Sequence, residues 1–185
     1  MGQAAWGAQL RFDRWLGGLA VGRPDWLVHP ADLLGLATRD VSTGAVVLVA
    51  AAILWRAQRR WAEWLLLSAL GGWVLQTLLK GIDGRERPDW AESAYHPTTA
   101  SFPSGHATTG IDSWVVLGII LLCAGLGRFA QVVGVAAIAI GVLLGPSRLV
   151  IGVHWPTDVL AGWLLGAAVA CAAGAVGVWR ARRVS

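Results

Sequence analysis

The chain has 185 residues, of which 56% are hydrophobic and 14% charged, and its formal net charge is +4. Soluble domains have about a quarter of their residues charged, so this composition excludes an ordinary soluble protein and favours one embedded in lipid. The length allows one domain, and we treat residues 1–185 as a single membrane-embedded unit. The basic residues lie between apolar runs rather than along one tract, so no nucleic-acid partner is expected.

Residues 1–40 are predicted to form an N-terminal segment at the membrane interface. Apolar residues such as Leu10 and Trp15 stand beside charged residues such as Arg11 and Asp13, which is typical of an amphipathic helix on a bilayer surface. The segment lacks the long apolar core and the small-residue cleavage site of a secretory signal peptide. Its charges also argue against insertion as a sixth span.

Five apolar runs follow, and each is predicted to cross the membrane as a helix. A helix needs about 20 residues to span the hydrocarbon core, so the first run is short unless it begins before residue 41. The fold expected for 41–185, the catalytic core, is all-α: a polytopic transmembrane helix bundle with about five spans. The runs are 41–55, 61–79, 107–125, 129–145 and 158–179.

Arginines beside the spans predict the orientation of the bundle. Seven of them fall on one side of the alternating path, which the positive-inside rule makes cytoplasmic, together with the C-terminus. We therefore expect a multi-pass protein of the cytoplasmic (inner) membrane. Basic residues such as Arg87 and Arg148 fall on the opposite side, against this rule, and therefore indicate a functional site on the extracytoplasmic face. The seven cytoplasmic arginines are Arg56, Arg59, Arg60, Arg128, Arg180, Arg182 and Arg183.

Three polar segments at the outer ends of the spans suit a tetrahedral oxyanion: 80–88, 103–106 and 147–158. The guanidinium groups of Arg87 and Arg148 can bind phosphate oxygens in a bidentate manner, and Lys80 adds a point charge. Gly105 opens a helix, and the N–H groups at a helix N-terminus favour an anion. The segments therefore predict a phosphate-binding pocket.

Three further polar residues have two readings each. Arg85 is either a phosphate contact or a solvated loop charge. Ser147 either joins the phosphate site or hydrogen-bonds a neighbour at the end of its helix. Asp112 lies inside the third span, where an acidic group is a functional hypothesis by default, although we favour a structural role behind the site.

The two histidines of these segments supply the chemistry that a phosphate pocket alone lacks. His154 and Asp158 are four residues apart and would share a face of a helix. A carboxylate bonded to one ring nitrogen fixes the tautomer and leaves the other nitrogen free to attack. His106 can donate a proton to the departing alkoxide. Together these residues indicate covalent phosphoryl transfer without a metal.

The motifs KxxxxxxRP, PSGH and SRxxxxxHxxxD occur here in that order, and they resemble the three signature motifs of the type 2 phosphatidic acid phosphatase superfamily. No motif position is substituted. The matching residues are Lys80, Arg87 and Pro88 in the first motif, Pro103, Ser104, Gly105 and His106 in the second, and Ser147, Arg148, His154 and Asp158 in the third.

The resemblance implies a bacterial membrane enzyme that hydrolyses a lipid phosphate or pyrophosphate without any metal or other cofactor. His154 would form a phosphohistidine, Asp158 would orient it, and His106 would protonate the leaving group and later activate water. Members commonly have another N-terminal span, which we do not expect in this sequence. The residues expected to hold the phosphoryl oxygens are Lys80, Arg87, Ser104, Gly105 and Arg148.

Two other functions are compatible with such a pocket. Vanadate imitates phosphate, so a vanadium-dependent haloperoxidase is one alternative, although five apolar spans argue against those soluble proteins. A bundle that only binds or transports a lipid phosphate is the other, although binding alone needs neither a nucleophile nor an acid. The implied substrates include polyprenyl pyrophosphates, phosphatidic acid, phosphatidylglycerophosphate and lipid A phosphates, and the sequence does not rank them.

Overall fold

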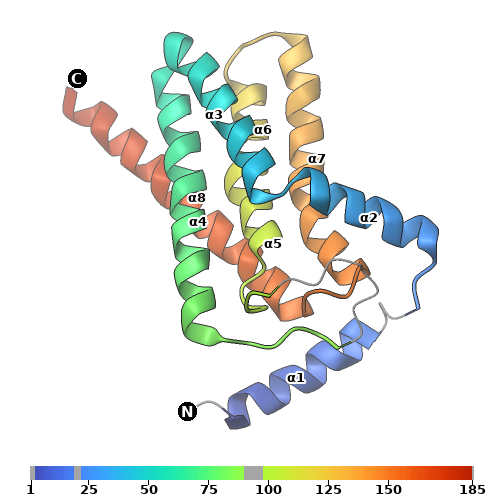
Figure 1. Ribbon diagram of the computed structural model, residues 1–185. Helices are drawn as coiled ribbons and strands as arrows, with labels where there is room; N and C mark the ends of the chain where they lie inside the picture. The colour runs from blue at the N-terminus through green and yellow to red at the C-terminus, as the bar shows by residue number, and fades with distance from the viewer. Residues whose placement is uncertain (1–2, 19–21, 90–97, 185) are drawn as a thin grey trace.

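The computed structural model describes residues 3–18, 22–89 and 98–184, and every regular element within these ranges is a helix (Figure 1). The expected all-α class is therefore confirmed. The helices in chain order are α1 (Gln3–Gly18), α2 (Asp25–Ala37), α3 (Asp40–Ala57), α4 (Arg59–Asp83), α5 (Gly105–Thr109), η1 (Gly110–Val115), α6 (Val116–Cys123), α7 (Arg128–Val150) and α8 (Pro156–Val184).

Five helices are long and apolar enough to cross a membrane, which confirms the expected number of spans. The first begins at Asp40, ahead of the apolar run, and so gains the length that the run lacked. The third is assembled from α5, the π-helix η1 and α6, which follow one another without a break. A buried apolar cluster including Leu54, Leu65 and Ile120 joins α3, α4 and α6.

The N-terminal region contains two helices rather than the single one expected. Gly22 adopts a left-handed φ of 71° and Pro24 is extended ahead of α2, so the chain turns before this second helix begins. Helix α1 packs against α8 across the end of the bundle where α4 ends and α8 begins, while α2 packs against α7 (Figure 1). Both N-terminal helices therefore contact spans that carry candidate site residues.

Asp112 lies in η1 and is buried against α4. Ser113 Oγ donates to Asp112 Oδ1 at 2.6 Å, while Oδ2 accepts no hydrogen bond from the described residues. A Cβ added at Gly72 would stand 1.6 Å from this Oδ2, so α4 needs a glycine here for η1 to approach. This packing supports the structural role that we favoured for Asp112.

Alanine at Gly72 is expected to lower the free energy of unfolding by about 2 kcal/mol, because the added methyl group collides with a buried carboxylate that has little room to move. Thermal unfolding in detergent measures this effect. Gly81→Ala is the control in the same helix, because nothing lies within 4 Å of its Cβ position, and this variant should be at least as stable as the parent. Equal stability of the two variants would contradict the packing.

Candidate active site

The start of α8 sets the geometry of His154 and Asp158. Pro156 is the first helical residue, a position that needs no backbone donor. Asp158, in the first turn, accepts a hydrogen bond from the Trp155 N–H at 2.9 Å, as in one half of a capping box. His154 therefore precedes the helix. The prediction that His154 and Asp158 share one face of a helix is wrong. His154 Nδ1 still lies 3.4 Å from Asp158 Oδ2.

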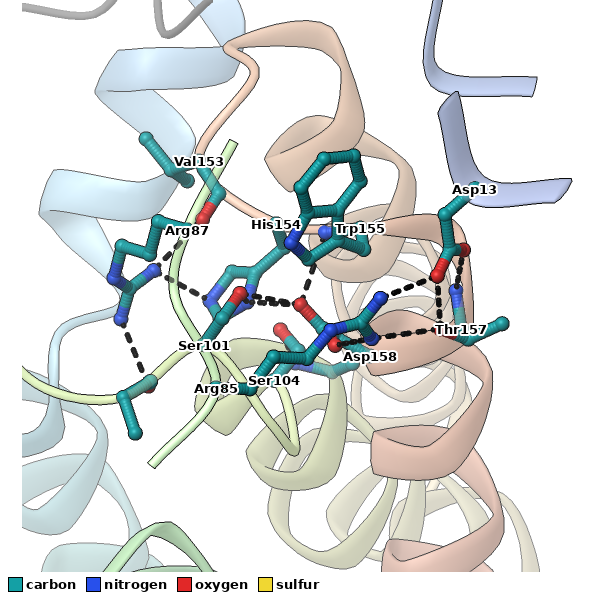
Figure 2. Close-up of polar contacts among 12 residues, drawn as sticks. Asp13, Arg85, Arg87, Ser101, Ser104, Val153, His154, Trp155, Thr157 and Asp158 are labelled. Atoms are coloured by element: carbon teal, nitrogen blue, oxygen red, sulfur yellow. Dashed lines mark hydrogen bonds and ion pairs between the residues drawn. The ribbon is translucent and has the colours of Figure 1, made fainter. Parts of the chain in front are cut away.

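The contacts of His154 determine which ring nitrogen is free to act as a nucleophile. Arg87 Nη1 lies 3.2 Å from Nε2, and because a guanidinium can only donate, Nε2 must accept (Figure 2). The proton of the neutral ring is therefore on Nδ1, which faces Asp158 Oδ2 and Ser101 Oγ, each at 3.4 Å. This arrangement directs the Nε2 lone pair toward the guanidinium of Arg87.

Burial lowers the pKa of His154 from 6.5 to about 4. The positive charges of Arg87 and Lys80 act in the same direction, and the hydrogen bond with Asp158 opposes them. A lowered pKa means that the folded protein keeps the ring neutral as the pH falls below 6.5. The neutral form of the ring, which has a free lone pair, is thus present throughout the neutral pH range.

The kcat/KM of the enzyme is therefore expected to stay constant as the pH falls below 6.5 and to decline only near pH 4. Initial rates of phosphate release over a pH series measure this profile, with unfolding monitored at each pH to separate titration from loss of structure. An acid limb near pH 6.5, the value of an unperturbed histidine, that does not follow the second ionisation of the substrate phosphate would contradict the assignment of the buried ring as the nucleophile.

Asp158 is fully buried and is held by residues outside the three motifs. Ser101 Oγ donates to its Oδ2, and Arg85 Nη1 donates to its Oδ1 at 2.5 Å (Figure 2). The second guanidinium nitrogen of Arg85 bonds Asp13 Oδ2. Of the two roles that the sequence suggested, a solvated loop charge is wrong because Arg85 is buried, and Arg85 is not among the described residues that line the cavity in front of His154. Sequence reasoning missed Ser101 and Asp13, because neither stands in a recognisable motif.

A cavity of about 450 Å³ lies in front of His154. Its cations are held by backbone carbonyl groups: Lys80 Nζ donates to Ala100 O at 2.7 Å, and Arg87 Nη1 to Val153 O at 2.8 Å. These hydrogen bonds help to orient the two side chains that line the cavity. The lining residues are Asp40, Gln76, Thr77, Lys80, Gly81, Arg87, Thr99, Ala100, Gly105, His106, Arg148, Val153 and His154.

Ser104 and Ser147 lie behind the cavity and are not among its described lining residues. Ser104 precedes α5, and its hydroxyl accepts a hydrogen bond from the Ala107 N–H. Ser147 Oγ accepts from Arg148 Nε at 3.1 Å and donates to the Leu144 carbonyl. Both hydroxyl groups therefore shape the pocket from behind: the first ends the loop before His106, and the second orients Arg148.

Helix α2 contacts two of the cavity residues directly. Arg148 Nη2 donates to the Ala31 carbonyl at 2.6 Å, and His106 Nε2 lies 3.1 Å from the Gly35 carbonyl, to which it must donate. A second cavity of about 210 Å³ begins at these same two side chains. Its remaining lining residues all belong to α2 and the start of α3: Asp32, Leu33, Gly35, Leu36 and Arg39.

Two glycines bring α8 against the loop and helix that carry Ser104 and His106. A Cβ at Gly162 would stand 2.6 Å from the Ser104 carbonyl oxygen, and one at Gly166 would stand 2.6 Å from that of Thr108. The close approach also lets Ser104 N donate to the Asp158 carbonyl at 3.0 Å. The second and third motifs, which are far apart in the sequence, are thereby joined backbone to backbone.

Comparison with known proteins identifies one family and several similar proteins. The family model of the PAP2 superfamily matches residues 61–182. The chain is 36% identical to phosphatidylglycerophosphatase B of Bacillus subtilis over 112 residues, which are 59% of this chain and 55% of that protein, so it spans about half of that relative. It is 31% identical to decaprenylphosphoryl-5-phosphoribose phosphatase of Mycobacterium tuberculosis over 168 residues, or 88% of this chain and 86% of that protein.

One solved structure resembles this fold along the whole chain. The crystal structure of a transmembrane PAP2 type phosphatidylglycerolphosphate phosphatase from Bacillus subtilis superimposes with a TM-score of 0.76 and 25% sequence identity. The match covers 100% of this chain and 90% of that protein. The helices described above therefore follow an arrangement already seen by experiment in a membrane protein.

Proposed function

Because this chain belongs to the PAP2 superfamily of phosphatases, we propose that it hydrolyses a phosphate monoester or pyrophosphate carried by a lipid, through a phosphohistidine at His154. One observation carries the mechanism: His154 Nε2 faces Arg87 in a cationic cavity while Nδ1 faces Asp158. A pocket that only bound phosphate would gain nothing from a neutral imidazole oriented by a buried carboxylate. We also propose that the reaction needs no divalent metal.

The cations that line the cavity bind the phosphoryl group in this proposal. Lys80 and Arg87 line the cavity from the end of α4 and the loop that follows, and Arg148 lines it from the end of α7, so the three would surround one tetrahedral anion. Gly105, at the first turn of α5, adds the N–H groups of a helix start. These groups stabilise the charge that develops on the equatorial oxygens as the phosphoryl group is transferred.

In the first step, the Nε2 lone pair of His154 attacks phosphorus as the bond between phosphorus and the leaving oxygen breaks. Asp158 holds the Nδ1 proton and stabilises the positive charge that appears on the ring. His106, which carries a second proton on Nδ1 when the anionic substrate is bound, gives that proton to the departing oxygen and becomes neutral, so the lipid leaves as an alcohol or as a lipid monophosphate.

In the second step, His106, now without that proton, accepts one from a water molecule. The resulting hydroxide attacks phosphorus, the bond to Nε2 breaks, and inorganic phosphate leaves. His154 returns to its neutral form with the proton still on Nδ1. The same cations stabilise both transition states, so one cavity serves both steps.

The cavity beside α2 supports a lipid as the leaving group. In-line displacement places the leaving oxygen opposite His154, on the side of His106. The second cavity begins there, and its walls include Leu33 and Leu36, which are exposed on the surface of α2. An alcohol with an apolar chain would lie in this cavity with its tail directed to the bilayer.

The ends of the spans support a site on the extracytoplasmic face of the cytoplasmic membrane. The turn between α3 and α4, the loop before α7 and the C-terminal end of α8 all lie at the end of the bundle opposite α1 (Figure 1). Arg56 and Arg59 flank that turn, and Arg128 begins α7. The positive-inside rule then places that end, with the C-terminus, in the cytoplasm and the site outside.

Phosphate release from a panel of lipids tests the proposal. Purified protein would be assayed in mixed micelles with phosphatidic acid, phosphatidylglycerophosphate and a polyprenyl diphosphate, with and without EDTA. We expect EDTA-resistant release from at least one of them, at a kcat/KM well above that for glycerol 3-phosphate, which lacks a tail. A folded protein that releases no phosphate from any lipid would contradict the proposed function, and loss of activity in EDTA would contradict metal independence.

A further inference from the structure

Asp13 is a buried carboxylate in a stretch of α1 that is otherwise largely exposed. Its exposed fraction is 0%, whereas that of Phe12 is 52% and that of Trp15 is 67%. The exposed aromatic side chains beside basic residues suit the surface of a bilayer. A charge that is fully buried at such a position needs partners within the protein.

The partners of Asp13 belong to the start of α8 and to the loop after α4. Its Oδ1 accepts from the Thr157 N–H at 3.0 Å, and its Oδ2 accepts from Thr157 Oγ1 at 2.7 Å and from Arg85 Nη2 at 2.5 Å. Thr157 lies in the first turn of α8, where a carboxylate stabilises the helix. Helix α1 is thereby fastened to the turn that carries Asp158.

Arg85 links the two carboxylates through one rigid group. Nη1 donates to Asp158 Oδ1 and Nη2 to Asp13 Oδ2, so the guanidinium lies between the two side chains (Figure 2). Because the guanidinium is planar, its orientation at Asp13 fixes its orientation at Asp158. Asp13 also shares the positive charge, which would otherwise act on Asp158 alone and weaken its hold on the Nδ1 proton of His154.

We propose that Asp13 is a positioning residue for the reaction at His154, acting through Arg85 to set the orientation and charge of Asp158. Asp13 is not among the described residues that line the cavity, so it affects the chemical step rather than substrate binding. The inference rests on the proposed function, because it assumes that Asp158 serves a nucleophilic His154.

Asp13→Asn in the full-length protein tests this role on a lipid phosphate that the parent hydrolyses. We expect kcat to fall about tenfold with KM within about twofold of the parent value. Asp25→Asn, the same change at an exposed residue of α2, is the control and should leave both constants unchanged. An unchanged kcat in folded Asp13→Asn would overturn the inference, whereas a parent protein without activity would instead contradict the proposed function.

A double-mutant cycle separates positioning from general stability. Asp13→Asn should lose its effect on kcat in a protein that already carries Arg85→Met, because its route to Asp158 is gone. If the two substitutions instead lowered kcat independently, so that their separate effects multiplied in the double variant, the inference would be overturned. Should Asp13→Asn not fold, Thr157→Val removes, without changing any charge, the hydroxyl that donates to Asp13 and accepts from Arg85. We expect this variant to lower kcat about threefold at unchanged KM. A parental kcat in that folded variant would also overturn it.

Discussion

Alanine in place of His154 is expected to reduce lipid phosphate hydrolysis by a factor of about 10⁴ or more. The variant lacks the nucleophile that bonds to phosphorus in the proposed mechanism, while the cations of the cavity and the carboxylate of Asp158 stay in place. The first measurement is phosphate release from the lipid that the parent hydrolyses fastest. The second is acid-labile, base-stable labelling of the protein by substrate carrying ³²P, which we expect in the parent and not in the variant.

His29→Ala is the matched control, because His29 is an exposed histidine on α2 and does not line the cavity. It should keep the parental rate and the parental labelling. Hydrolysis by folded His154→Ala at the parental rate would exclude the phosphohistidine. Labelling that persists in His154→Ala would instead assign the covalent intermediate to another residue.

Alanine at Gly35 is expected to lower kcat/KM about 100-fold with little change in stability. A Cβ there would stand 2.0 Å from Arg148 Nη2 and 2.1 Å from Nη1, and Arg148 is only 2% exposed. The guanidinium must therefore move, and it is one of the cations that we propose hold the phosphoryl group. A displacement of about 1 Å in such a group costs about 10²-fold in rate. Steady-state kinetics and thermal unfolding measure the two effects.

Gly44→Ala serves as the control, since Gly44 lies in the next helix and nothing stands within 4 Å of its Cβ position. It should leave both kinetics and stability close to the parental values. If Gly35→Ala kept its activity within about twofold, α2 would have room to shift, and its contact with Arg148 would not set the geometry of the site.

The sequence was sufficient for the architecture because lipid imposes simple rules. A span needs about 20 apolar residues, and the five runs of this chain are separated by arginines and glycines. The turn at Gly22 and Pro24, which was not predicted from the sequence, lies outside the spans and is not governed by this rule. Both helices of the N-terminal region are short and neither has the length of a span, so the boundary between them is marked only by the turn residues Gly22 and Pro24.

The candidate site was predictable only in part, for a reason of distance along the chain. The motif residues stand at the ends of predicted spans, and that placement was enough to bring Lys80, His106 and His154 to one side. The contacts that orient them were not predictable, because Asp13 and Thr157 are separated by 144 positions and Arg85 and Asp158 by 73. Only tertiary structure distinguishes the buried Arg85 from a solvated loop charge.

The separation between Asp13 and its partners also has a consequence for biosynthesis. Asp13 leaves the ribosome before any of the five spans, whereas Thr157 and Asp158 belong to the last of them. The buried charge cluster can close only after α8 has entered the membrane and met both the loop after α4 and helix α1. Nascent chains that stop short of α8 contain the three cations that we propose bind phosphate but lack the carboxylate of Asp158 beside His154. Hydrolytic activity would therefore arise only at the end of membrane insertion, so it reports complete assembly of the bundle.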